Sequence, residues 1–298
     1  MDLFGNKEKN TLYIIGNGFD IHHSIDSRYS DFQKFLYSTG NSYLAGQLET
    51  YYPNIVNSKD YKWGDLEKAL GEIDYITTYN ECNDDVEIDY DHMMQTSAIL
   101  EDKPQQMLEE TLCNLHRVFE KWVSSLDVMV EKDDELYLFN QNGIFLNFNY
   151  TETLEVVYNI PQSSITYIHG RRNRGESLIL GHSSEIDPTE AFFEDNTVYE
   201  DNAYEGIIGI ANTQKKNVDD IISSKKYFWE LLKDINRIIT YGHSFSDVDI
   251  PYFEKISSVI KKDAEWHFGC YNEKDRLKAK ELANRLGIDN SHYCCFDF

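Results

Sequence analysis

The sequence has few basic residues, no long apolar run and no paired-cysteine motif. Its 298 residues include 28 Lys and Arg against 52 Asp and Glu, which gives a net charge of −24. That charge repels phosphates and anionic lipids, so we expect no extended nucleic-acid surface and no membrane partner. No apolar run reaches the roughly 20 residues that a membrane span needs, and the opening MDLFGNKEKNT has no apolar signal segment. We therefore predict a cytoplasmic protein.

The cysteines are odd in number and show no CxxC spacing. They are Cys82, Cys113, Cys270, Cys294 and Cys295. This pattern argues against a disulfide framework and against a structural zinc ribbon. We expect reduced thiols and no bound metal.

Short apolar runs rich in strand-forming residues recur along the chain, with helical periodicity between them. They are TLYIIG (11–16), GIFLNF (143–148), SITYIHG (164–170), SLILGH (177–182), RIITYGH (237–243), EWHFGCY (265–271) and the terminal HYCCFDF (292–298). Strands that are apolar throughout are usually covered on both faces, as in parallel sheets. The pattern predicts an α/β fold with a Rossmann-like, open, mostly parallel sheet.

The first two strand patterns are separated by residues 17–142, far more than one crossover helix needs. Helical patterns near 28–38, 61–78 and 104–129 occupy this interval. We therefore predict a helical subdomain inserted at about 28–135 into a single domain of residues 1–298. A second irregular, acidic and aromatic stretch at 185–206 is interpreted as a segment that packs down as a lid.

Polar residues follow the predicted strands, where ligands bind in an open parallel sheet. The strand ends read GNGFD, FNYTE, IHGRR, GHSSE and GHSFSDVDIP. In the first, Gly16 and Gly18 would let backbone approach a phosphate. The third glycine of the dinucleotide motif is missing, so a plain tight turn remains the alternative.

The later strand ends have structural alternatives as well. Asn149 precedes Thr151, a credible helix N-cap, and a structural Asn that ends a strand is the alternative. His169 is followed by Arg171, Arg172 and Arg174, which supply local positive charge. A buried core histidine and a solvated arginine loop are the alternatives. Gly242 and Pro251 predict a second junction between strand, loop and helix, of the kind that binds a phosphate or a ribose. A plain helix cap is the alternative for Asp249.

The order of motifs resembles the AbiH family of bacterial abortive-infection proteins along nearly the whole chain. The motifs are LYIIGNGFD, HHSIDSRYSDFQKFL, WGDLE, FNYTETLE, YIHG, LILGHS and YGHSFSDVDIPYF. That family is similar to a divergent branch of the sirtuin-like NAD-binding fold. The resemblance implies a role in phage defence, with NAD as the substrate and without a metal.

The resemblance also implies roles for particular residues. The implied cofactor-binding residues are Gly16, Asn17, Gly18, Phe19, Arg171, Gly242, His243, Ser244 and Asp247, and the implied catalytic residues are His169, Asn149 and Asp20. Thr151 stands where an Asp usually follows the Asn, and the four-cysteine zinc ribbon of protein deacylases is missing. The missing ribbon disfavours deacylation and leaves cleavage of NAD by water.

The chemistry of the residues supports the same choice. Breaking the nicotinamide glycosidic bond develops positive charge on the ribose, which Asn149 and Asp20 would stabilise. A neutral His169 would accept a proton. We predict an anti-phage abortive-infection protein that hydrolyses NAD to nicotinamide and ADP-ribose when triggered. A phage-derived trigger and a homo-oligomer both remain open.

Two rival functions belong to other classes. One is a non-catalytic nucleotide-binding sensor or scaffold of a defence system, which Thr151 favours. The other is a nuclease, which would need a basic track that the composition does not provide.

Overall fold

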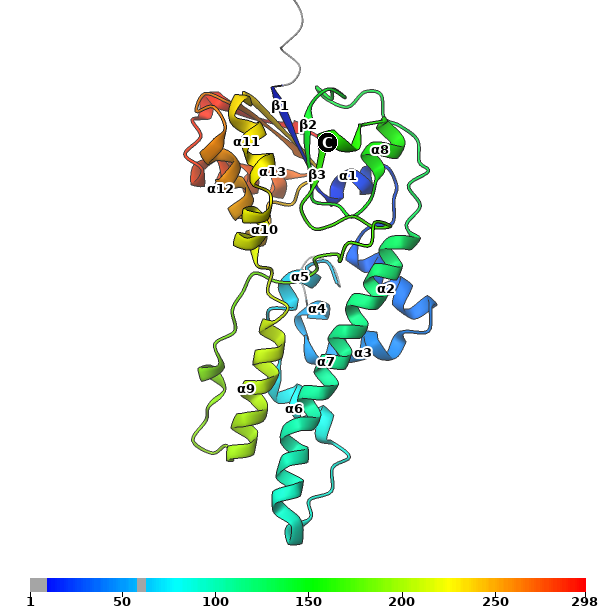
Figure 1. Cartoon of the computed structure of the whole chain (residues 1–298), viewed down its shortest axis with the longest axis vertical. Coiled ribbons are helices and arrows are strands. Elements are labelled where there is room, and N and C mark those ends of the chain that lie inside the picture. The colour runs from blue at the N-terminus through cyan, green and yellow to red at the C-terminus, as the bar shows by residue number, and fades with distance from the viewer. Residues whose placement is uncertain (1–9, 58–62) are drawn as a thin grey trace, which may run out of the picture. The chain divides into compact units, whose positions relative to one another are not determined.

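The computed structural model describes residues 10–57 and 63–298 and divides the chain into two compact units (Figure 1). The sheet unit comprises Met1–Ser27, Val123–Ile179 and Asn217–Phe298, and the helical unit comprises Arg28–Trp122 and Leu180–Lys216. The predicted absence of a signal segment rests largely on residues 1–9, outside the described residues. Within the described ranges, no helix combines the length and apolarity needed to cross a membrane.

The sheet unit is built on six parallel strands in the order β3-β2-β1-β4-β5-β6. The strands are β1 Thr11–Ile15, β2 Ile144–Asn147, β3 Ile165–Tyr167, β4 Arg237–Tyr241, β5 Glu265–Cys270 and β6 Tyr293–Asp297. This is the strand order of Rossmann folds, in which the chain reverses its direction across the sheet between β1 and β4. The predicted open, mostly parallel α/β sheet is confirmed.

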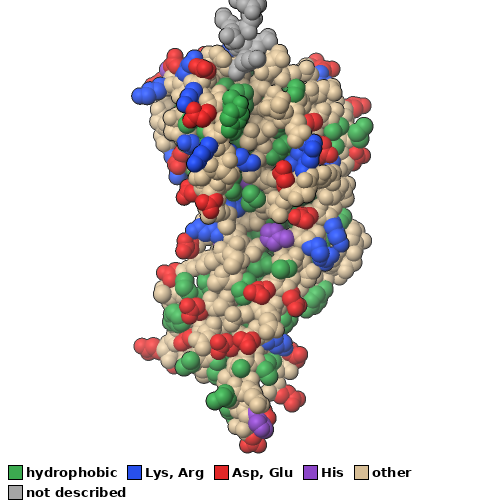
Figure 2. Space-filling model, viewed as in Figure 1, with side chains coloured by type: hydrophobic (Ala, Val, Ile, Leu, Met, Phe, Trp, Pro, Cys, Tyr) green, Lys and Arg blue, Asp and Glu red, His purple; other side chains and the backbone are tan. Residues whose placement is uncertain are grey.

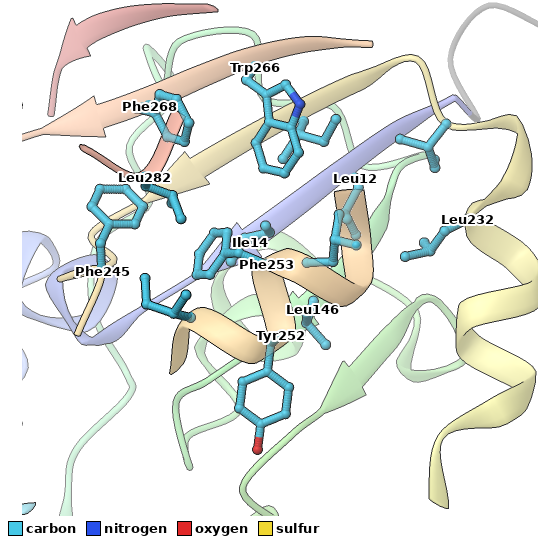
Figure 3. Packing of buried hydrophobic residues seen from close by; sticks show 14 of the residues in the cluster. Leu12, Ile14, Leu146, Leu232, Phe245, Tyr252, Phe253, Trp266, Phe268 and Leu282 are labelled. Atoms are coloured by element: carbon cyan, nitrogen blue, oxygen red, sulfur yellow. The ribbon is translucent and has the colours of Figure 1, made fainter. Parts of the chain in front are cut away.

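Strand β1 is apolar after Thr11 because helices cover both faces of the sheet. Leu12 and Ile14 belong to a buried cluster with residues of the helices on one face (Figure 3), whereas Tyr13 and Ile15 pack on the other. Each such side chain contributes about 1.5–3 kcal/mol by leaving water. The first face is covered by α10 Val218–Ser224, α11 Lys226–Leu231, α12 Ile250–Val259 and α13 Glu273–Arg285, and the second by α1 Asn17–His22 and α8 Thr153–Tyr158.

The run SLILGH, predicted as a strand, does not join the sheet. His182 makes only an isolated parallel bridge with Lys215. The N–H of His182 donates to the carbonyl of Gln214, and its carbonyl accepts from the N–H of Lys216. The apolar run is therefore an extended segment paired with a short loop, a case that apolarity alone does not distinguish from a sheet strand.

The helical unit contains the predicted helix near 28–38, but its other helices begin elsewhere. The longest helix starts at Met93 rather than near 104 and carries Pro104 inside it. Part of the stretch predicted as an irregular lid is helical, because Thr197 and Glu200 form a capping box that begins α9. The helices are α2 Tyr29–Ser38, α3 Ser42–Tyr51, α4 Asn54–Asn57, α5 Leu66–Ala69, α6 Tyr75–Asn83, α7 Met93–Ser125, whose last turn enters the sheet unit, and α9 Val198–Asn212.

Short 3-10 helices complete the description: η1 Tyr90–His92, η2 Gln162–Ser164, η3 Pro188–Ala191, η4 Leu232–Asp234, η5 Asp247–Asp249 and η6 Asn290–His292. The predicted insertion at 28–135 overlaps the first segment of the helical unit, which ends at Trp122. The second segment, Leu180–Lys216, was not expected in this unit.

Candidate functional site

Gly16 and Gly18, after β1, pack directly against the loop that follows β4. The N–H of Gly16 donates to the carbonyl of Tyr241 (2.9 Å), and the N–H of Gly18 donates to that of Gly242 (2.8 Å). A Cβ on either glycine would lie 2.6 Å from backbone atoms of this loop, and Gly242 has a φ of +63°. The glycines are therefore needed for the contact between two loops, and two of the amides expected to face a phosphate already have partners.

The neighbouring residues of this turn, Asn17 and Phe19, have different surroundings. Asn17 is exposed, and its Nδ2 donates to the carbonyl of Ser27 (2.9 Å). Phe19 is fully buried, with its ring against those of Tyr158 and Tyr241. A nucleotide contact at Phe19 would therefore involve its backbone.

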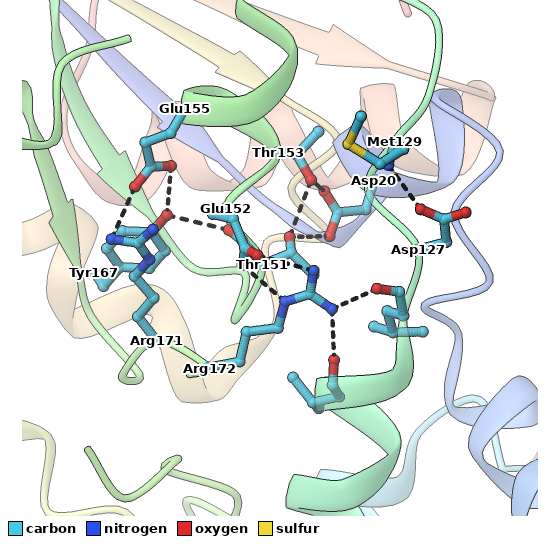
Figure 4. Close-up of polar contacts among 12 residues, drawn as sticks. Asp20, Asp127, Met129, Thr151, Glu152, Thr153, Glu155, Tyr167, Arg171 and Arg172 are labelled. Atoms are coloured by element: carbon cyan, nitrogen blue, oxygen red, sulfur yellow. Dashed lines mark hydrogen bonds and ion pairs between the residues drawn. The ribbon is translucent and has the colours of Figure 1, made fainter. Parts of the chain in front are cut away.

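Asp20 is a buried carboxyl group held by the loop after β2 (Figure 4). Its two oxygens accept hydrogen bonds from the hydroxyls of Thr151 (2.5 Å) and Thr153 (2.8 Å). Burial raises the pKa of Asp20 above its ordinary value, although the two hydroxyls, Asn149 and Arg172 oppose this shift. The prediction of Thr151 as an N-cap is wrong, because Glu152 occupies that position in α8.

Asn149 carries a buried amide group just beyond the end of β2. Its side chain is 5% exposed, and neither Oδ1 nor Nδ2 has a hydrogen-bond partner among the described residues. The amide lies near enough to Asp20 to help lower that residue's pKa, without the geometry of a full hydrogen bond. Leaving a buried polar group unsatisfied costs about 1–3 kcal/mol. A ligand that offers a donor and an acceptor would recover this free energy.

Hydrogen bonds with Asn147 and Tyr167 fix the loop that carries Asn149. The N–H of Asn149 donates to Oδ1 of Asn147 (2.9 Å), and Nδ2 of Asn147 donates to the carbonyl of Thr151 (3.4 Å). The hydroxyl of Tyr167, from β3, donates to the same carbonyl (3.2 Å). The position of Asn149 is thus fixed by β2, β3 and α1 together. Sequence analysis missed Asn147 and Tyr167, because residues inside a strand pattern give no sign of a supporting role.

His169 and His243, from the ends of β3 and β4, lie on either side of the Asp249 carboxylate. Oδ1 of Asp249 is 3.9 Å from Nε2 of His169, and Oδ2 is 3.6 Å from Nε2 of His243. The ring of Phe148 meets both imidazoles edge to face. The structure therefore brings the ends of β2, β3 and β4 together in one buried cluster.

The protonation of His243 is determined by its surroundings. The N–H of Phe245 donates to its Nδ1 (3.0 Å), so the proton of the neutral ring lies on Nε2, facing Asp249. Burial, with the charge of Lys278 adding to it, lowers the pKa of His243 to about 3. His243 is thus neutral at physiological pH and can donate a hydrogen bond without exchanging a proton.

Asp249 stands at the N-cap of α12, but its side chain caps no N–H of that helix. It accepts instead from the hydroxyl of Ser246 (2.8 Å) and faces the two histidines. Sequence analysis left Asp249 open between a helix cap and part of a phosphate- or ribose-binding junction, and it did not pair this residue with a histidine. Nothing in the local sequence distinguishes a capping aspartate from one turned toward a histidine of another strand.

Arg171 and Arg172, which follow His169, are both paired within the sheet unit (Figure 4). Nη1 of Arg171 is 3.3 Å from Oε1 of Glu155, and its guanidinium lies over the ring of Tyr167. Its predicted contact with a nucleotide phosphate would have to compete with Glu155. Arg172 forms a two-pronged ion pair with Glu152 and also donates to backbone carbonyls at the end of α7.

The remaining predicted binding residues, Ser244 and Asp247, are exposed in the loop after β4. Nζ of Lys278 donates to the carbonyl of Ser244 (3.1 Å).

On the face seen in Figure 2, Lys and Arg are interspersed with Asp and Glu. In the part of the chain that the structure describes, no three His, Cys, Asp or Glu side chains are grouped to hold a metal ion.

A comparison with protein families identifies the chain. The family model described as "Bacteriophage abortive infection AbiH" matches residues 12–269, a span that contains every candidate residue above. The chain belongs to the AbiH family and has a role in abortive infection, a defence against bacteriophage. No curated protein and no solved structure matches it. The likeness to sirtuin-like NAD-binding domains stays a prediction.

Proposed function

We propose that the sheet unit binds NAD at the carboxyl edge of β2, β3 and β4 and hydrolyses it to nicotinamide and ADP-ribose during phage infection. The strand order supports a dinucleotide ligand, because Rossmann folds bind dinucleotides near the point where the strand order reverses. The loops after β1 and β4 meet at that point.

The amide of Asn149 is the single observation that carries this proposal. Buried polar groups in native proteins are almost always hydrogen-bonded, and an exception requires an explanation. Here both amide atoms are buried without a partner among the described residues. The amide lies near Asp20, and the preceding residue, Phe148, contacts both histidines with its ring. A ribose hydroxyl can both donate to Oδ1 and accept from Nδ2, so an NAD ribose would satisfy the amide.

Hydrolysis breaks the bond between C1′ of the ribose and the nicotinamide nitrogen. The bonding electrons leave with nicotinamide, which becomes neutral, and positive charge develops on the ribose. The oxygen of Asn149 stabilises that charge, and a water molecule forms the new bond to C1′. His169 accepts the proton that this water loses, which a neutral imidazole can do near pH 7.

Asp20 supports the site rather than contacting the ribose. Both of its oxygens are engaged by Thr151 and Thr153, so the carboxylate ties α1 to the loop that carries Asn149. In this assignment, Thr151 helps to position Asn149. A threonine in place of the usual aspartate at position 151 is therefore compatible with catalysis.

The test is nicotinamide release from NAD, followed by chromatography with purified full-length protein. We expect His169→Ala and Asn149→Ala to lower the rate at least about 100-fold, the usual scale for an acid–base or electrostatic group. His92→Ala and Asn290→Ala, at exposed positions, serve as matched controls and should retain the wild-type rate. Circular dichroism checks that every variant is folded.

Equal rates in the wild type and both site variants would overturn the assignment. Wild-type protein that binds NAD in calorimetric titration but releases no nicotinamide, even in extracts of phage-infected cells, would instead favour the nucleotide sensor.

A further inference from the structure

We infer that Asp249 is a positioning residue for His169, and that it acts with His243 as a buried Asp–His pair at this site. The inference rests on the proposed function, in which His169 accepts the proton. The sequence around Asp249 suggests a helix cap, and the inference gives its carboxylate a part in the proposed reaction instead.

The carboxylate of Asp249 is turned away from the helix that it begins. Aspartate at an N-cap normally accepts from a backbone N–H of the first turn, a contact that stabilises helices by about 0.5–2 kcal/mol. Asp249 makes no such bond in α12. Asp74, at the N-cap of α6, shows the usual arrangement and accepts from the N–H of Thr77 (2.9 Å). A helix cap therefore does not account for the orientation of Asp249.

Neighbouring groups hold the carboxylate toward the histidines. The hydroxyl of Ser246 donates to Oδ2, and the Nε2 proton of His243 faces the same oxygen. Since Phe245 occupies Nδ1 of His243, that ring cannot present its other tautomer without losing the bond. Oδ1 is thereby directed to Nε2 of His169.

A buried carboxylate beside an imidazole has two effects on proton transfer. It fixes the orientation of the ring, and it stabilises the imidazolium that forms when the ring accepts a proton, as in Asp–His pairs of hydrolases. The distance of 3.9 Å is longer than a hydrogen bond. Such contacts often tighten only when the substrate is bound.

Other ionisable groups also lie near the two rings. Tyr252, from α12, and Tyr150, from the loop after β2, lie beside His169. Lys278, from α13, acts on His243. The carboxylate of Asp249 lies against both imidazoles.

The experiment compares wild type and Asp249→Asn by the kinetics of nicotinamide release and by NMR of the full-length protein with ¹⁵N-labelled histidine. We expect kcat to fall at least about tenfold while KM for NAD changes less than about twofold, because Asp249 acts through His169. The ¹⁵N shifts of His169 between pH 5 and 8 should differ from those of the wild type. Asp74→Asn is the matched control and should change neither measurement.

The outcomes separate this inference from the proposed function. If wild type releases nicotinamide and Asp249→Asn keeps its kcat, the inference is overturned while the proposed function stands. If wild type releases none, the proposed function fails and the NMR comparison alone decides. Unchanged His169 shifts then reject the positioning role, and altered shifts support it. If Asp249→Asn does not fold, Ser246→Ala replaces it, with a severalfold fall in kcat expected and an unchanged kcat counting against the role.

Discussion

Arg172 and Glu152 form a fork-to-fork ion pair, with Nε–Oε2 at 2.7 Å and Nη2–Oε1 at 3.0 Å. The remaining guanidinium nitrogen donates to the carbonyls of Val123 and Leu126 at the end of α7. One buried side chain thus joins the start of α8 to the end of the longest helix. Although Glu152 is partly buried, Arg172 holds its pKa below the ordinary range.

Arg172→Met should destabilise the protein by about 3–5 kcal/mol, because it leaves the Glu152 carboxylate and two carbonyls without their partner. Urea unfolding followed by circular dichroism measures this loss. Arg174→Met is the control, since Arg174 is exposed and bonds only to Gln162 among the contacts that the structure records. A loss below about 1 kcal/mol for Arg172→Met would show that the ion pair is not needed.

Gly18→Ala should lower the melting temperature, because its new Cβ would lie 2.6 Å from the backbone of Gly242. Overpacking of this kind costs about 1–3 kcal/mol. Gly209→Ala, in α9 with nothing near its would-be Cβ, should raise stability by about 1 kcal/mol. If the melting temperatures of the two variants shift in the same direction, this explanation of the glycine-rich turn is contradicted.

The difference in stability between Asp20→Asn and wild type should change with pH. Burial raises the pKa of Asp20 above its ordinary 3.8. The folded state therefore binds its proton more tightly than the unfolded state does. The stability that this group contributes is complete below pH 3.8 and is lost as pH rises through the raised value. Wild type should thus lose stability relative to Asp20→Asn above about pH 4. Urea unfolding from pH 4 to 8 tests this, and a constant difference would refute it.

His243 should stay neutral, with its proton on Nε2, throughout pH 5–8. Its pKa of about 3 lies below this range because the ring is buried. The unfolded chain binds the proton more readily, so the contribution of His243 to stability is complete above its ordinary pKa of 6.5 and is lost toward pH 3. Histidine ¹⁵N spectra give the tautomer directly. A titration midpoint between 5 and 8 would contradict the buried environment.

The sheet was largely predictable because its strands are continuous apolar runs. Five of the six internal runs, and the terminal run, contain strands of the sheet. Helix α13 was also predictable from its ends: Asn272 caps the N–H of Asp275, and Gly287 adopts a φ of +68°. The prediction of SLILGH as a sheet strand was wrong because this run pairs with the loop at Gln214–Lys216, outside the sheet. The sequence of that loop shows no strand pattern.

The site was only partly predictable. The strand ends placed Asn149, His169 and His243 at one edge of the sheet, because parallel strands end on the same side. The pairings of Asp20 with Thr151 and of Asp249 with the histidines depend on side-chain directions. Local sequence does not determine those directions, because the partners come from different strands.

The central position of β1 has a consequence for biosynthesis. Leu12 pairs with Ile144 on one side and with Ile238 on the other. The ribosome therefore makes β1 before either neighbour, and it makes β4 only after β2 and the helices between them. Until then, β1 has an unpaired edge and apolar side chains that attract other chains. The sheet therefore cannot pair β1 on both sides before β4 has been made, and a molecular chaperone that covers β1 during this interval would prevent aggregation.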